Sequence, residues 1–390
     1  TVMSVFEMGT AEDTPVGTPA ERQIFYARVA NRLRISRHRA ITAWFIGNEL
    51  NGAWNAYVCE KDYEEKFLHF PGGCTFKDNA TRLCELIDDA CAVVQAEGKL
   101  CTTPWAGVGT PGKYNWQIGP QFGWDQDWGW QNWMKVCEGT RGPSGGRSWE
   151  KFNGGEEYEG VEHIDFWSAN LYPGKDFASS GNFKMYEVAS DMPLLVSEYG
   201  IDAYNTNVNH PDYNESWFDK RMVGFEDMPT QAEWLLSLTE DLERHSSACQ
   251  HGCAPEADRV CVGGSIMAWV DEWWKGRVIE ATSFDTRTDT MGDLCPDLEA
   301  NVHSPCGYPT LANGEDTGSQ PDSYVNEEWF GLFHVSEPTC KSGGSWGLKV
   351  DKLKARDAWL RLKLLWARGS CLVFRDKDGG SLYTQPYNTT

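Results

Sequence analysis

Two glutamates, Glu49 and Glu198, are the residues of this sequence that are best placed to do chemistry. Each follows a short apolar run, residues 40–46 for Glu49 and residues 193–197 for Glu198, and the first of these runs is rich in β-branched and aromatic residues. Such runs predict buried strands. The carboxyl ends of parallel strands open onto the face where α/β barrels place their active sites. We therefore take Glu49 as the leading candidate catalytic residue and Glu198 as its counterpart.

Two carboxylates at strand ends can cleave a glycosidic bond with retention when they lie about 5 Å apart. One protonates the leaving oxygen while the other attacks the anomeric carbon, so the first must keep its proton and the second must stay ionised. Asn48, next to Glu49, is expected to bind the hydroxyl beside the reacting carbon. A single Glu after an apolar run usually just caps or solvates a loop, but the matched pair favours catalysis.

The elements that must position this pair alternate between strand and helix along the chain. Helical periodicity occurs in residues 20–37, 76–98, 231–245 and 352–368. Six strands are predicted, beginning at Thr1, Ala40, Lys99, Val161, Pro193 and Val260. This alternation predicts a parallel α/β sheet. Because no internal repeat or low-complexity linker is present, we expect one domain over residues 1–390, with residues 277–325 as a loop insertion.

Six strands are two fewer than a (β/α)8 TIM barrel needs. We therefore expect a barrel that lacks its first strand–helix units in this numbering, with a separate N-terminal segment to complete it and long disulfide-bearing loops. Residues 106–160 are rich in Gly and Trp and show little periodicity. That length predicts a functional loop, because ordinary connections are much shorter.

Composition excludes several classes of function. The net charge of -22 argues against a nucleic-acid partner, because phosphates would be repelled over most of the surface. No apolar run is long enough to span a bilayer. The 8 His are scattered, and no spacing predicts a metal site. We expect neither a metal nor a cofactor.

The 13 Cys predict several disulfides and an oxidising compartment. Their odd number leaves one thiol free or paired elsewhere. Candidate pairs in or near loops or helix faces, whose connectivity the sequence leaves open, are Cys84 with Cys91, Cys249 with Cys253, and Cys295 with Cys306.

Three sequons begin at Asn79, Asn214 and Asn388. In a secreted eukaryotic chain these would be glycan acceptors. Together with the cysteines they predict a secreted glycoprotein, extracellular or in a cell wall.

The 19 Trp could serve as platforms for the apolar faces of sugars, although most Trp residues fill cores. We expect Trp54, Trp105 and Trp273 at a substrate cleft, with core packing as the alternative for each. Four more crowd one loop, either as a platform or as a hydrophobic cluster: Trp124, Trp128, Trp130 and Trp133.

Two acidic residues follow the last predicted strand. Asp271 and Glu272 are candidates to bind sugar hydroxyls at the rim of the site. The same sequence, DEWWKG, is equally compatible with a salt-bridged turn.

Three motifs together resemble a known family: GNELNG at residues 47–52, SEYG at residues 197–200, and the strand-end Trp269. They look like the signature of the clan of retaining glycoside hydrolases with (β/α)8 barrels. That clan includes β-galactosidase- and β-glucuronidase-like enzymes, family 5 cellulases and mannanases, and yeast-type β-1,3-glucanosyltransferases. The resemblance covers residues 1–276 and resumes at Trp329.

The resemblance implies a role for each matching residue. Glu49 would be the acid/base on the fourth strand and Glu198 the nucleophile on the seventh. Tyr172, near the end of the sixth strand together with the candidate substrate-binding Asn170, resembles the tyrosine that hydrogen-bonds the nucleophile. Trp269 resembles the eighth-strand aromatic under the reacting sugar.

These observations predict a secreted retaining β-glycosidase or transglycosylase that acts on a β-linked oligo- or polysaccharide of the glucan or mannan type. The alternative is a catalytically inactive, glycosidase-like structural or carbohydrate-binding protein of an extracellular assembly. The missing strands, cysteines and sequons motivate that alternative, and the intact glutamate pair counts against it.

Overall fold

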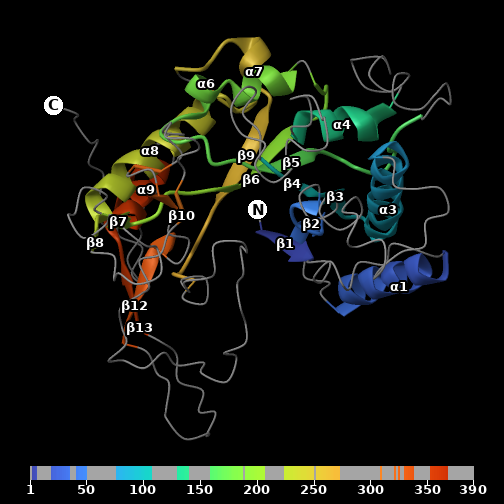
Figure 1. Cartoon of the computed structure of the whole chain (residues 1–390), viewed down its shortest axis with the longest axis horizontal. Helices are drawn as coiled ribbons and strands as arrows, with labels where there is room; N and C mark the ends of the chain where they lie inside the picture. Colours follow the sequence, from blue (N-terminus) through green and yellow to red (C-terminus); the bar gives the residue numbers. More distant parts are fainter. Residues whose placement is uncertain are drawn as a thin grey trace, which may run out of the picture. The chain divides into compact units, whose positions relative to one another are not determined.

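The structure is a computed structural model that describes residues 2–6, 19–35, 41–50, 76–107, 130–139, 159–187, 189–206, 224–249, 252–272, 308–309, 320–321, 324–325, 329–337 and 352–367. The chain divides into two compact units (Figure 1). The first unit comprises residues 1–200 and 238–267, and the second comprises residues 201–237 and 268–390. Each unit is described by itself, and the expectation of one domain stays a prediction. The expected insertion, residues 277–325, lies almost wholly outside the described residues.

The first unit is built on parallel strands in two sheets, with the orders β1-β2-β3 and β4-β5-β6-β9. These strands are β1 (Val2–Phe6), β2 (Ile41–Ile46), β3 (Leu100–Thr102), β4 (Pro104–Ala106), β5 (Trp167–Asn170), β6 (Leu194–Tyr199) and β9 (Cys261–Ile266).

Thr103 joins the two sheets. It separates β3 from β4, and its hydroxyl donates to the Ile46 carbonyl at 2.8 Å. With β3 and β4 taken as one run, the six predicted strands and their parallel α/β arrangement are confirmed. The described strands do not close a barrel, so the closure of the predicted barrel remains a prediction.

The strands form where the sequence carries its apolar runs. Ala43 and Phe45 of β2 pack with Phe166 and with Leu195 of β6 in one buried cluster. Parallel strands buried on both faces have nearly continuous hydrophobic sequences, which explains why they could be recognised without a clear alternation.

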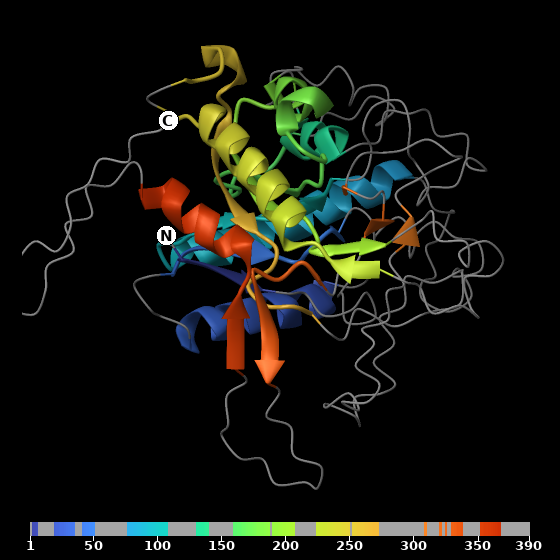
Figure 2. The same ribbon diagram turned by 90° about the vertical axis from the view of Figure 1, so that its left-hand side faces the viewer.

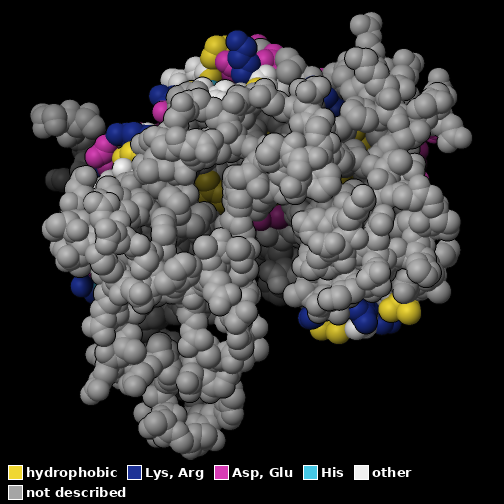
Figure 3. Space-filling model, in the orientation of Figure 1, with side chains coloured by type: hydrophobic (Ala, Val, Ile, Leu, Met, Phe, Trp, Pro, Cys, Tyr) yellow, Lys and Arg dark blue, Asp and Glu magenta, His cyan; other side chains and the backbone are white. Residues whose placement is uncertain are grey.

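Helices lie between successive strands of this unit: α1 (Pro19–Ile35), α3 (Phe76–Ala96), α4 (Trp130–Glu138), α6 (Phe177–Ser180), α7 (Asn182–Glu187) and α8 (Met228–Arg244). The first residues of α8, up to Ser237, belong to the second unit. A 3-10 turn, η5 (Glu256–Asp258), follows α8. The predicted apolar face of α3 is confirmed, since Leu83, Ile87 and Val94 are buried. Its neighbour α1 contacts it, and the Tyr26 hydroxyl donates to Asp89 across the pair at 2.7 Å. Where α1 lies, Figure 3 shows Lys and Arg side chains beside apolar ones.

Helix α4 corrects the expectation of little order in residues 106–160. Trp130, Trp133 and Met134 lie on its buried side, and the Trp133 ring stacks on Trp105 with 5.5 Å between centroids. For Trp130 and Trp133 the structure thus agrees with a hydrophobic cluster. The sequence did not predict this helix, because 9 residues between Gly- and Trp-rich flanks give little periodic signal. Trp124 and Trp128 lie outside the described residues.

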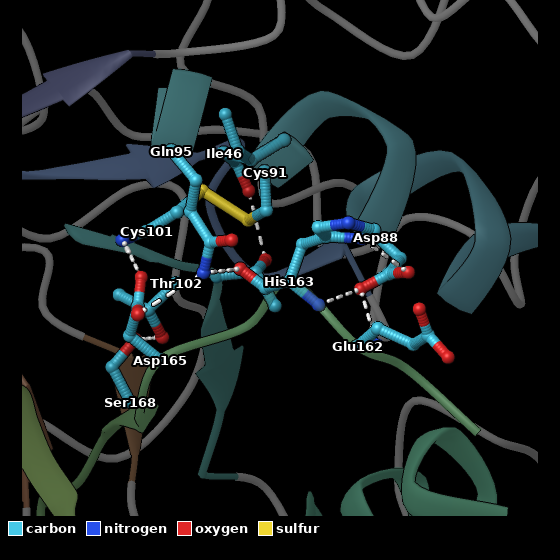
Figure 4. The surroundings of a disulfide bond; sticks show 11 residues. Ile46, Asp88, Cys91, Gln95, Cys101, Thr102, Glu162, His163, Asp165 and Ser168 are labelled. Atoms are coloured by element: carbon cyan, nitrogen blue, oxygen red, sulfur yellow. Dashed lines mark hydrogen bonds and ion pairs between the residues drawn. A yellow bond between two sulfur atoms is a disulfide. The ribbon is translucent and has the colours of Figure 1, made fainter. Parts of the chain in front are cut away.

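Two disulfides hold α3 in place. Cys84 is bonded to Cys137 of α4, and Cys91 to Cys101 of β3, so the candidate partners Cys84 and Cys91 are each bonded elsewhere. Around the second bond, the Asp165 carboxylate accepts the Cys101 N–H at 2.8 Å (Figure 4). These crosslinks fix the helix to the strand that leads into the candidate site.

Of the other two candidate pairs, one lies among the described residues. Cys249 and Cys253 form a disulfide, as the sequence allowed. Cys261, the first residue of β9, is a buried free thiol, and burial raises its pKa to about 11. Cys295 and Cys306 lie outside the described residues.

The described residues of the second unit form three antiparallel strand pairs and the helix α9 (Asp357–Ala367). The pairs are β7 (Tyr204–Thr206) with β8 (Gly224–Glu226), β10 (Tyr308–Pro309) with β11 (Tyr324–Val325), and β12 (Phe333–Glu337) with β13 (Lys352–Ala355). The helix α9 begins five residues later than predicted from residue 352. Residues at the predicted helix start instead pair with β12 (Figure 2), because a tertiary strand partner overrides local helix propensity.

Candidate active site

The carboxyl ends of β2, β4, β5 and β6 bring the candidate residues of the first unit together. Asn170 ends β5 and is the register partner of Ala106 on one side and of Glu198 on the other. On the far side of β4, the Glu49 N–H donates to the Pro104 carbonyl at 2.9 Å. Glu49 and Glu198 therefore lie on the same edge of the parallel array, with Asn170 between them.

Glu49 has an unusual backbone. Its φ is +51°, in the left-handed region that non-glycine residues rarely adopt, and it follows Gly47 at φ +71°. Such strain persists only where surrounding contacts hold it, and it concentrates at functional sites. Here Leu50 is buried and the N–H bond to Pro104 fixes the turn. The result is a half-buried Glu49 carboxylate that leaves the strand at a defined angle.

The Asn170 side chain connects this turn to the next strand. Its amide Nδ2 donates to Oε1 of Glu49 and to Oδ1 of Asn48, each at 3.1 Å. Its Oδ1 accepts a bond of 2.7 Å from the Ser197 hydroxyl. Asn170 and Ser197 are both buried, whereas Asn48 is exposed. The amide thus holds the two residues of the Asn48–Glu49 pair in one arrangement.

Glu198 is held by the chain segment that follows β5. The Tyr172 hydroxyl donates to its Oε2 at 3.0 Å and also lies 2.8 Å from the sulfur of Met267. Because a hydroxyl has one proton and a carboxylate is the stronger acceptor, the Glu198 bond takes it. The Leu171 N–H, next to Tyr172, donates to the Glu198 carbonyl at 2.8 Å. Both the side chain and the backbone of Glu198 are therefore fixed from β5.

The arrangement places two half-buried carboxylates at the ends of β2 and β6, on the two sides of Asn170, each bonded to a neutral donor. A carboxylate bonded to a neutral hydroxyl keeps its charge and its lone pairs, as a nucleophile requires. A carboxylate bonded at one oxygen can carry a proton on the other. Chemically, the pair can supply one nucleophile and one proton donor.

Close packing behind the site depends on Gly107. A Cβ at this position would lie 2.1 Å from the carbonyl oxygen of Asn170, which is far inside van der Waals contact. Glycine therefore allows the chain leaving β4 to pass against the residue that carries the central amide.

Trp105 is not a sugar platform in this structure, which corrects one sequence expectation. Its ring is 0% exposed and lies between Trp133, at 5.5 Å, and Trp167, at 6.0 Å between centroids. The sequence placed Trp105 just beyond a strand, but it lies within β4, whose three residues are all buried, so the alternative of core packing holds for Trp105.

Trp269 and Glu272 belong to the second unit, where Trp269 is 54% exposed and packs on Phe333 and Trp359. Strand β9 ends at Ile266, so Trp269 does not end that strand as expected. Asn79 lies in the first turns of α3. The other candidates lie outside the described residues: Trp54, Trp273, Asn214 and Asn388.

The second unit contains a charge cluster of a different kind. Buried Arg356 donates from Nη1 and Nη2 to the two Asp271 oxygens at 2.5 and 2.8 Å, and from Nε to Glu226 at 2.8 Å. Burial opposes ionisation of Glu226, but the Arg356 guanidinium and His334 outweigh it and hold the pKa of Glu226 below its usual value. Of the two interpretations of Asp271, the structure thus shows the salt bridge.

Ser197 and Met267 were missed as site residues. Ser197 stands within the SEYG motif, and its place directly before a candidate nucleophile was the available signal. Met267 follows β9 and gave no signal, because its sulfur meets Tyr172 only through the strand order. Among the described residues, no group of three or more His, Cys, Asp and Glu could hold a metal ion. No described helix is long and apolar enough to cross a membrane.

Comparisons with known proteins give structural neighbours only. No protein-family model matches the chain, and no curated protein matches it. A β-1,3-glucanosyltransferase active-site mutant of Rhizomucor miehei, in complex with laminaritriose, is similar over 67% of this chain and 65% of its own, with 11% identity and a TM-score of 0.31.

Two further neighbours are an endo-laminarinase from Formosa and a GH113 β-1,4-mannanase. They cover 81% and 62% of this chain and 58% and 67% of their own, each at 11% identity, with TM-scores of 0.33 and 0.29. This chain spans less than two thirds of the length of the glucanosyltransferase and the laminarinase. Likenesses of this strength do not assign an activity, so the function below is argued from the site itself.

Proposed function

We propose that this protein cleaves β-linked glycans of the glucan or mannan type with retention, using Glu49 as acid/base and Glu198 as nucleophile. One observation supports the proposal above the others. Asn170, between the two strand ends, bonds the Glu49 carboxylate while its register partner is Glu198, itself bonded by Tyr172. A structural role for one such glutamate is common, but two on one edge of the parallel array, with Asn170 between them, favour a two-carboxylate reaction.

The reaction proceeds in two displacements. A carboxylate oxygen of Glu198 forms a bond to the anomeric carbon as the glycosidic C–O bond breaks. The electron pair of that bond stays on the leaving oxygen, which takes the proton of Glu49. Glu49, now ionised, removes a proton from water or from a sugar hydroxyl, whose oxygen then attacks the anomeric carbon and releases Glu198. Water gives hydrolysis, and a sugar hydroxyl gives transglycosylation.

Residues around the pair have separate tasks in this proposal. Tyr172 orients the nucleophile through its hydrogen bond to Oε2 of Glu198. Asn48, exposed beside Glu49, donates to the hydroxyl next to the reacting carbon. Trp54 and Trp273 remain candidates for the substrate cleft, Glu272 for sugar hydroxyls at its rim, and Trp269 for the ring of the reacting sugar.

The decisive test uses azide with alanine variants of the two glutamates. An aryl β-glycoside is incubated with Glu198→Ala, and azide replaces the missing nucleophile from its side, so the product is the α-glycosyl azide. With Glu49→Ala the Glu198 intermediate still forms, and azide gives the β-glycosyl azide. Each variant should lose about 10³-fold or more of wild-type turnover without azide. Product anomers are assigned by proton NMR.

The proposal fails if the wild-type protein leaves β-glucans, β-mannans and aryl glycosides intact. Sugar binding without cleavage would then identify a carbohydrate-binding protein that keeps the fold but not the activity. Reversed azide products would instead exchange the roles of Glu49 and Glu198.

We also infer that the protein is secreted. Three disulfides among the described residues favour an oxidising compartment. Extraction of the native protein from culture medium or cell wall, with a mobility shift on deglycosylation, would support this location and the use of the three sequons. Recovery only from cytosol, with reduced thiols, would refute it.

A further inference from the structure

The orientation of the Asn170 amide is set by its neighbours. The Ser197 hydroxyl donates to Asn170 Oδ1, and Nδ2 faces two acceptor oxygens, Asn48 Oδ1 and Glu49 Oε1. A flipped amide would place its oxygen against those two acceptors and lose both bonds. Ser197 therefore stabilises the one orientation in which the amide can hold Glu49.

The hydrogen bonds from Ser197 to Asn170 and from Asn170 to Glu49 involve buried groups. Ser197 and Asn170 are 4% and 1% exposed, so water does not easily replace a lost bond. The backbone of Glu49 is strained and depends on its contacts to stay in place. The Asn170 bond reaches the carboxylate at the far end of that strained residue.

We propose that Ser197 is a positioning residue for acid catalysis: through the Asn170 amide it holds the Glu49 carboxyl group where the leaving oxygen must receive its proton. The inference rests on the proposed function and deepens it. Oε1 accepts the amide N–H, so in the acid form the proton resides on Oε2. None of these three hydrogen bonds is made to the Glu198 carboxylate, so Ser197→Ala removes a bond on the side of the proton donor.

The kinetic test compares aryl β-glycosides whose phenols differ in acidity. An acidic phenol leaves without protonation, whereas a weakly acidic phenol needs the proton of Glu49. Ser197→Ala is expected to lower kcat/KM about tenfold or more for the phenyl glycoside and much less for the dinitrophenyl glycoside. Ser197→Thr, which keeps the hydroxyl, should restore the ratio. Equal losses on both substrates, or no loss, would overturn the inference.

Ser168→Ala is the matched control. Ser168 is also buried and lies on β5, and its hydroxyl is 3.2 Å from that of Thr102 rather than bonded to Asn170. The same chemical change there should leave the ratio between the two substrates unchanged. A ratio that changes equally in Ser168→Ala would assign the effect to general loosening of the sheet and refute the role of Ser197.

A second measurement needs no activity. The side-chain amide signals of Asn170 are identified in asparagine-¹⁵N-labelled protein by their absence from Asn170→Ala. In the wild-type background Glu49→Gln should shift these signals, because an amide replaces the carboxyl group that accepts the Asn170 N–H. In the Ser197→Ala background the shift should shrink, and an unchanged shift would refute the inference. If the wild-type protein cleaves no glycoside, the proposed function fails and this measurement alone decides whether Ser197 fixes the amide.

Discussion

The carboxylates of the two units are held in opposite ways. In the first unit Glu49 and Glu198 are half-buried and take hydrogen bonds from an amide and a phenol. In the second, Asp271 is buried against the guanidinium of Arg356. A cation neutralises a buried carboxylate and uses its lone pairs, so that group serves stability. Neutral donors orient a carboxylate while leaving its charge available, which is what chemistry at a strand end requires.

Removing the cation of the second unit should have the largest effect on stability. Arg356→Leu leaves Asp271 buried without its partner and Glu226 without its guanidinium bond. We expect a loss of roughly 3–5 kcal/mol in the free energy of unfolding, measured by urea denaturation. Arg361→Leu, on the exposed face of helix α9, which begins directly after Arg356, should change it by less than about 0.5 kcal/mol. Similar losses for both variants would remove the stabilising role assigned to the Arg356 cluster.

Equivalent amide substitutions should separate the two kinds of carboxylate. Asp271→Asn keeps the shape but removes the charge that Arg356 faces, so a loss of roughly 2–3 kcal/mol is expected. Glu198→Gln should change the free energy of unfolding by less than about 1 kcal/mol, because its half-exposed partner is the neutral Tyr172 hydroxyl. Thermal and urea unfolding of both variants check the contrast. A large loss in Glu198→Gln would mean that the site also holds the fold together.

Glu138 is an intermediate case that sharpens the comparison. It is buried, yet its donors are the Trp167 indole and the Ser190 hydroxyl, and burial raises its pKa above the usual value. The folded state therefore binds a proton more tightly than the unfolded chain, so stability falls as pH rises from about 4.5 through the raised pKa. Each pKa unit of the increase corresponds to about 1.4 kcal/mol.

Glu138→Gln should remove this dependence. Unfolding measured from pH 4 to 8 is expected to show a wild-type curve that declines in that window and a variant curve that declines less. If the wild-type and variant curves run parallel, ionisation of the buried Glu138 carboxyl does not lower the free energy of unfolding.

The smallest expected effect concerns the strained backbone of Glu49. Alanine usually stabilises a position relative to glycine, but at φ +51° its Cβ meets the following carbonyl. Glu49→Gly should therefore unfold with a free energy about 1 kcal/mol higher than that of Glu49→Ala. The two variants lack the carboxylate equally, so their difference reports strain alone. The usual order, with alanine more stable, would show that the turn is relaxed.

Sequence patterns were sufficient to predict where the parallel strands lie and that Glu49 and Glu198 stand at strand ends. Apolar runs such as residues 40–46 and 193–197 can only be satisfied by burial, and a Glu at the end of such a run is costly unless it has a use. The apolar face of α3 could also be predicted from the sequence, because Leu83, Ile87 and Val94 recur at helical spacing.

Other features depended on contacts between distant segments. Trp105 looked like a strand-end platform, but Trp133 from the unrecognised helix α4 covers it. Residues 352–355 looked helical, but β12 gives them a strand partner. The partners of Cys84 and Cys91 lie 53 and 10 residues away, and no local pattern distinguishes them from other cysteines.

The sequence by itself therefore determined which residues could do chemistry and that strands would carry them, since both follow from local composition and periodicity. Only the tertiary structure decided how these residues meet. Strand order places Asn170 between Glu49 and Glu198, and burial of Ser197 beside it fixes the amide. The physical reason is that hydrogen bonds across strands depend on register, which the residues of any one strand do not specify.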